Sequence, residues 1–156
     1  MSANATNEAD EPNSIAIILC GKSSETGTQV SRLIRPEFEV IHFVNSFEDA
    51  KADIPELIAG RGPKRPGSNN IGSGDYSRPP RAVIFGRAFD PEHVLELHRL
   101  FRGTGSMPVA WIAGDPQFVL PAEIPAGYAE KAADNVKRAF AKWEDAGDMS
   151  EEIVYY

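Results

Sequence analysis

The chain has 156 residues, of which 42% are hydrophobic and 25% charged, and this is the composition of a single soluble globular domain. Its 16 Lys and Arg residues and 23 Asp and Glu residues give a net charge of −7, so the chain lacks the basic character that nucleic-acid binding requires. No run of about 18 apolar residues is present, which excludes a membrane-spanning helix, and a single cysteine excludes an internal disulfide.

The N-terminal segment, residues 1–13, is predicted to be a disordered acidic tail. It carries Glu8, Asp10 and Glu11, and it lacks the basic and apolar regions of a secretory signal. A mitochondrial presequence would be rich in arginine, and this segment contains none. We therefore expect a cytoplasmic protein, with the nucleus as the alternative compartment.

Four apolar segments have the pattern of strands that are buried on both faces. They are residues 14–20, 38–44, 82–85 and 108–113. Residues 151–156 also have strand character, and they fit either a fifth, edge strand or a segment that docks elsewhere.

Helical patterns follow each of the four apolar segments. They run from Thr28 to Arg35, over a short segment after Ser46, from Asp90 to Gly103, and from Tyr128 to Ala146. Thr26 and Gln29 form a capping-box pattern before the first helix, and Asp90 is a good N-cap for the third. Pro55 is expected to kink or restart the second helix.

This alternation of strands and helices predicts one α/β domain over residues 14–156. The strands would form a mainly parallel sheet of a three-layer Rossmann-like or flavodoxin-like sandwich. Right-handed crossovers give four strands in the order 2-1-3-4, or five if the C-terminal segment adds an edge strand, 2-1-3-4-5.

Residues 60–81 interrupt the pattern. They include five positive charges and one negative charge, together with five glycines and four prolines. Such a segment buries too little apolar surface to offset its ordering entropy, so we expect a mobile basic loop that is dispensable for folding. Only Ile71 and Tyr76 in it are sizeable apolar groups that could anchor it to the core.

In folds of this class, ligands bind outside the carboxyl ends of the strands, where the strand order reverses. Here these ends are Cys20-Gly21 and Gly86-Arg87. A glycine-bearing turn that leads into a helix offers backbone N–H groups and the positive end of the helix dipole to an anion. The predicted ligand-binding residues are Gly21, Lys22, Ser23, Ser24, Thr26, Gly27, Asn45, Gly86 and Arg87.

Residues 15–45 resemble the NAD(P)-binding turn of NmrA-like and other atypical short-chain dehydrogenases, whose pattern is G-x-x-G-x-x-G. Gly21 and Gly27 match the first and third glycines, and Ser24 stands in place of the second. The resemblance implies a Rossmann-like fold with NAD(P) or another nucleotide as cofactor. An active dehydrogenase of this kind needs a Tyr-x-x-x-Lys pair, and Tyr128 is followed by Lys131, one residue too early.

Two classes of function follow from the sequence. The first is a small Rossmann-like protein that binds a nucleotide or other small anionic ligand, or a non-catalytic regulatory or interaction module that binds a protein or a second copy of itself. The alternative is a small enzyme whose crevice lies at the carboxyl ends of strands 1, 3 and 4, without identifiable catalytic residues. No metal site is predicted, because His93 and His98 are five residues apart and would not align on a helix.

Overall fold

A computed structural model describes residues 14–64, 70–118 and 120–156, and it contains a five-stranded, all-parallel sheet in the order β2-β1-β3-β4-β5. The strands are β1 (Ile15–Cys20), β2 (Phe38–Val44), β3 (Ala82–Phe85), β4 (Ala110–Ala113) and β5 (Ile153–Tyr155). The predicted α/β class and strand order are confirmed, and the C-terminal segment is the fifth, edge strand.

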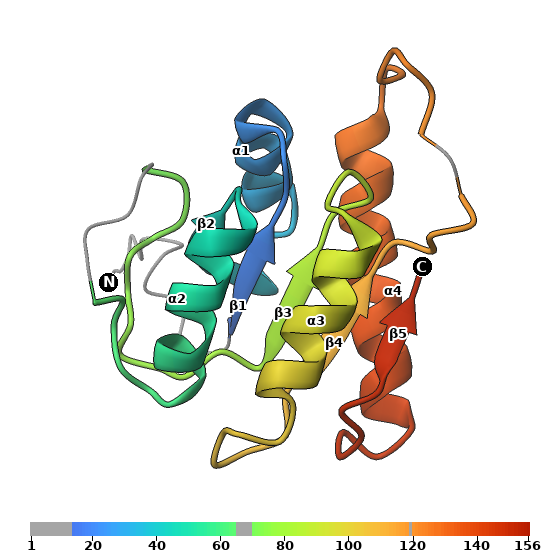
Figure 1. Ribbon diagram of the computed structural model, residues 1–156. Helices are drawn as coiled ribbons and strands as arrows, with labels where there is room; N and C mark the ends of the chain where they lie inside the picture. Colours follow the sequence, from blue (N-terminus) through green and yellow to red (C-terminus); the bar gives the residue numbers. More distant parts are fainter. Residues whose placement is uncertain (1–13, 65–69, 119) are drawn as a thin grey trace, which may run out of the picture.

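Helices cover both faces of this sheet (Figure 1). They are α1 (Ser24–Leu33), α2 (Phe47–Ile58), α3 (Pro91–Phe101) and α4 (Tyr128–Asp145). One hydrophobic cluster joins α1 and α4 to the sheet, and a second joins α2 and α3 to it. Because both faces are covered, the strands are mostly apolar rather than alternating, with Glu39 and His42 of β2 as buried polar exceptions.

The first helix begins earlier than predicted. Ser23, not Thr26, is the N-cap of α1, and its side chain accepts a hydrogen bond from the backbone N–H of Thr26 at 3.1 Å. Gly27 consequently lies inside the helix rather than at the end of a long turn, and the connection from β1 shortens to Gly21, Lys22 and Ser23. Our expectation of a Gly21–Gly27 turn was therefore wrong in extent.

The second helix runs without a break from Phe47 to Ile58, so the predicted restart at Pro55 was also wrong. Ser46 caps it as expected, through a hydrogen bond from the N–H of Asp49. Ile54 and Leu57, on either side of Pro55, are buried against the sheet. We attribute the continuity to this packing, which outweighs the one backbone hydrogen bond that a proline removes.

Residues 70–81 of the basic loop pass beside β2. Ser73 and Gly74 donate backbone hydrogen bonds to the carbonyls of Val40 and Ile41. Gly72 has a φ of +96°, and a Cβ there would lie 3.1 Å from the backbone nitrogen of His42. This close approach to β2 requires a glycine.

Two side chains of the loop also satisfy buried polar groups of β2. Arg78 pairs with the buried carboxylate of Glu39 at 3.0 Å. The hydroxyl of Tyr76 lies 2.8 Å from Nδ1 of the buried His42, whose Nε2 lies 2.9 Å from Asp53. Residues 71–78 are thus anchored to the domain, while the mobility of the whole segment 60–81 stays a prediction.

Candidate functional site

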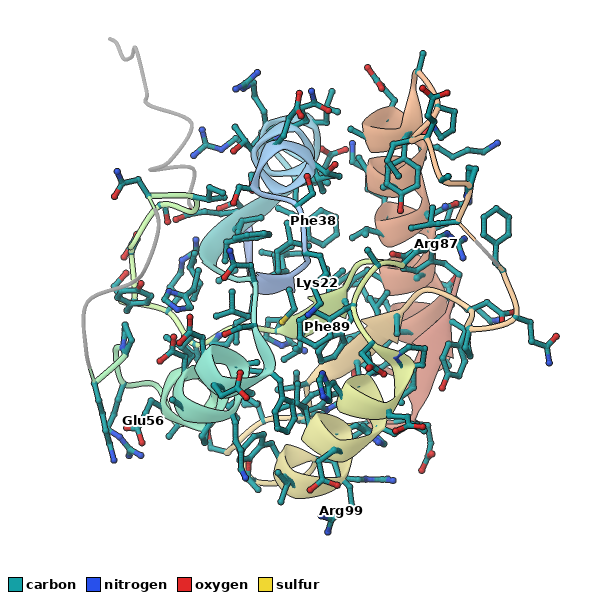
Figure 2. The ribbon with its side chains drawn as sticks, turned by 45° about the horizontal axis from the view of Figure 1, so that its top comes forward. Lys22, Phe38, Glu56, Arg87, Phe89 and Arg99 are labelled. Carbon is teal, nitrogen blue, oxygen red and sulfur yellow. The ribbon has the colours of Figure 1, made fainter. Side chains whose placement is uncertain are left out.

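A crevice opens at the carboxyl ends of β1 and β3, on the face of the sheet that α1 and α4 cover. Its cavity volume is about 90 Å³. Figure 2, in which this end of the sheet comes forward, shows Lys22, Phe89 and Arg87 around the ends of the strands. The crevice therefore lies at the topological switch point, where the sequence predicted a ligand site.

Most of the predicted site residues meet in this crevice. Its lining includes Gly21, Lys22, Ser23, Thr26, Gly27, Gly86 and Arg87. Ser24 and Asn45 do not line it: Ser24 is the first residue of α1 and is exposed, and Asn45 follows β2. The position of Ser24 follows from the helix start: because Ser23 is the N-cap, Ser24 lies in the first turn of α1.

The N-terminus of α1 is a weaker anion-binding site than the sequence suggested. Ser23 already satisfies the N–H of Thr26, and Glu25 places a negative charge in the first turn of the helix. This carboxylate already interacts with the positive N-terminal end of the helix dipole, and its negative charge repels an incoming anion. Within the described residues, the strongest attraction for an anion must come from side chains.

Gly27 has a packing role. A Cβ at this position would lie 2.5 Å from Cε1 of Phe43, a ring at the end of β2 that is 2% exposed. The glycine therefore lets α1 approach the sheet closely, as the third glycine of dinucleotide-binding turns does. Packing does not require a glycine at position 21, since a Cβ on Gly21 would lie 3.6 Å from the same ring, an ordinary van der Waals distance.

Arg87 places a positive charge at the crevice. Its guanidinium lies 4.2 Å from the ring centre of Phe118 and 4.7 Å from that of Tyr156, as in cation–π contacts. Gly114 leaves room for this side chain, because a Cβ there would lie 2.5 Å from Cγ of Arg87. Packing thus fixes the position of the guanidinium.

The Nη1 atom of Arg87 is buried and has no hydrogen-bond partner within the described parts of the chain. No acidic side chain of those residues pairs with this arginine either. Ser31, Arg81 and His93 each have a buried, unpartnered polar atom as well, so the feature that distinguishes Arg87 is a positive charge at the crevice that no described carboxylate neutralises.

Two tyrosines complete the crevice, and the sequence analysis did not assign either to it. Tyr128 begins α4, and Tyr156 is the last residue of the chain, held beside β4 by backbone hydrogen bonds with Ala113 and Asp115. Burial raises the pKa of both phenols, while the nearby charge of Arg87 acts in the opposite direction. Both are therefore neutral hydrogen-bonding groups at pH 7.

The two hydroxyls differ in their partners. Tyr156 donates to the backbone oxygen of Phe85 at 3.1 Å. The hydroxyl of Tyr128 has no hydrogen-bond partner in the portion of the chain that the structure describes. Tyr128 can therefore donate to a ligand. No local signal connects residue 156 with residues 20–27, so only the tertiary structure could place Tyr156 here.

Cys20 also lies at the crevice, but its side chain is fully buried. Burial raises the pKa of this thiol far above its ordinary value, so the thiol stays protonated. A protonated thiol is a poor nucleophile. Cys20 therefore acts as a small buried side chain of β1, in agreement with the apolar run around it.

The histidines have structural surroundings. His98 lies 2.5 Å from the backbone oxygen of Glu151, and the ring of His93 stacks on that of Phe47 with centres 4.3 Å apart. Within the described residues, no three His, Cys, Asp or Glu side chains are grouped as metal ligands. None of the described helices is both long and apolar enough to cross a bilayer.

These features define a Rossmann-like α/β protein with a crevice at the switch point and, beside it, an arginine that pairs with no acidic side chain of the described residues. Across 147 residues the chain is 30% identical to "Kojic acid related protein 6" of Aspergillus oryzae (strain ATCC 42149 / RIB 40), and the alignment covers 93% of this chain and 87% of the relative. The chain belongs to the family of this protein. No protein-family profile matches the chain, and no solved structure matches it.

Proposed function

We propose that this protein binds a small anionic ligand in the crevice between α1 and α4. The observation that carries the proposal is the positive charge of Arg87, which lines the crevice and pairs with no acidic side chain among the described residues. Lys22 and Ser23 stand on the α1 side of the crevice, and Tyr128 on the α4 side. An anion between them would accept hydrogen bonds and satisfy the guanidinium.

A nucleotide such as NAD(P) remains one candidate for this ligand. The connection from β1 to α1 at the switch point supports it, as does the packing role of Gly27. The name of the Aspergillus relative associates that protein with kojic acid, so kojic acid is a second compound to test. We also expect the protein to act in the cytoplasm, with the nucleus as the alternative.

The test is a thermal-shift panel of NAD, NADP, ATP, a simple phosphate ester and kojic acid. A ligand at a hundred times its dissociation constant stabilises by about 2.7 kcal/mol, which raises the Tm of a domain of this size by roughly 5–10 °C. Arg87→Met removes the charge and keeps an apolar stem, so it should abolish the shift. Arg138→Met, an exposed position on α4, is the matched control and should preserve it.

Two results would contradict the proposal. One is a panel in which no compound moves the midpoint at millimolar concentration. The other is a shift that Arg87→Met and Arg138→Met reduce equally, which would indicate an unspecific charge effect. In either case a regulatory or interaction module on the same fold becomes the better hypothesis.

A further inference from the structure

The inner wall of the crevice is apolar. It is formed by Leu19, Val30, Phe43, Ile84, Ala132 and Val136. Five of these residues are at most 6% exposed, and all six belong to or pack against the cluster that joins α1 and α4 to the sheet. The cavity is thus a space at the edge of this hydrophobic cluster, and it opens at the carboxyl ends of the strands.

The polar groups of the crevice stand elsewhere. Lys22 and Ser23 precede α1, and Thr26 lies in its first turn. Arg87 follows β3, and Tyr128 begins α4. A ligand that uses both regions needs an anionic head beside Arg87 and an apolar part that enters the core. The separation of charge and apolar wall therefore specifies an amphiphilic molecule.

The same features disfavour a dinucleotide. Dinucleotide sites place a glycine where the backbone approaches the pyrophosphate and an acidic residue near the end of the second strand for the ribose. Here Ser24 takes the place of that glycine, and β2 is followed by Asn45, which does not line the crevice.

We propose that the crevice selects a small monocarboxylate with a short aliphatic tail, with the carboxylate on Arg87 and the tail between α1 and α4. This inference rests on the proposed function and names its ligand class. An enclosed apolar cavity of roughly 150 Å³ holds benzene, so the 90 Å³ of this open crevice has room for a short chain of carbons. Planar guanidinium groups bind carboxylates in a two-point geometry.

The experiment measures dissociation constants by calorimetry for acetate, butyrate, pentanoate, hexanoate and octanoate, with inorganic phosphate, ATP and NAD in parallel. Affinity should rise about fourfold for each buried methylene and stop rising once the cavity is full. Pentanamide, which has the same tail without the charge, should bind at least tenfold more weakly than pentanoate.

Two substitutions on α4 test where the tail lies. Ala132→Leu fills the cavity from its wall and should remove the dependence on chain length, leaving all carboxylates as weak as acetate. Ala141→Leu is the control, because Ala141 is exposed on the same helix. It should leave the chain-length series unchanged.

The outcomes separate this inference from the proposed function. Binding of phosphate, ATP or NAD that depends on Arg87, with no effect of chain length, overturns the carboxylate inference and keeps the anion site. Chain-length dependence that survives in Ala132→Leu also overturns it, because the tail then lies elsewhere. If neither carboxylates nor phosphates bind, both proposals fail together.

Discussion

Glu151 holds the C-terminal segment against the domain, and its removal should cost about 3 kcal/mol of folding stability. Its carboxylate accepts hydrogen bonds from the indole of Trp111 at 2.9 Å and from the backbone N–H groups of Gly103 and Val109 at 2.8 and 3.3 Å. The same residue leads into β5 and then to Tyr156 at the crevice. Glu151 thus links the stability of the domain to the shape of the site.

The magnitude follows from the surroundings of each donor. Trp111 is completely buried, so the loss of a bond to a charged acceptor there costs roughly 1.5–3 kcal/mol. Val109 is also buried, and its longer bond contributes roughly 0.5–1.5 kcal/mol. Gly103 is exposed, so water replaces the lost acceptor at little cost.

Urea denaturation of Glu151→Ala and Glu152→Ala, followed by circular dichroism, tests this reasoning. Glu152 is the matched control: its side chain is 72% exposed and pairs with Arg102, and such surface pairs contribute about 0–1 kcal/mol. The loss of stability in Glu151→Gln should lie between those of the two alanine variants, because the amide has one acceptor oxygen whereas both carboxylate oxygens of Glu151 accept hydrogen bonds. Equal losses in Glu151→Ala and Glu152→Ala would refute the assignment.

Three further predictions concern other parts of the domain. Trp143→Ala should lower the free energy of unfolding by about 3–5 kcal/mol, since this ring is 2% exposed and its indole N–H donates to the backbone oxygen of Ser150. A loss below about 1 kcal/mol in the same denaturation assay would contradict its burial. Arg78→Ala should lower the free energy of unfolding by about 2–4 kcal/mol, because it leaves the buried Glu39 with a weaker set of partners. Arg61→Ala removes an exposed partner of Glu56 and should cost less than about 1 kcal/mol; equal effects would show that the Arg78–Glu39 pair contributes no more than a surface pair. Above pH 9.0, the ordinary pKa of the thiol, Cys20 of the unfolded chain loses a proton that the folded state retains, so the free energy of unfolding should fall by up to about 1.4 kcal/mol per pH unit. The free energy of unfolding of Cys20→Ala should depend less on pH between pH 9 and 10. Identical slopes for the two proteins would argue against a protonated thiol in the folded state.

Local patterns were sufficient for the architecture. The apolar run of β1 and the β-branched and aromatic residues of β2 predict buried strands, because a parallel sheet with helices on both faces offers them no solvent. Asp90 and Ser46 predicted their helix starts because a capping hydrogen bond joins residues only two or three positions apart. The helix start at Ser23 was missed because Ser23 and Thr26 are both good N-cap residues, and the continuity of α2 at Pro55 was missed because the packing of Ile54 and Leu57 is not a local signal.

The site depended on contacts that no local pattern contains. Arg87 was predicted from its position after β3, but its contacts with the rings of Phe118 and Tyr156 are decided by the tertiary structure. His42 joins Asp53 and Tyr76, which are 11 and 34 residues away in the sequence. Such groups meet because chain closure brings distant segments to one place, and the free energy of that closure comes from the whole core rather than from the residues that meet.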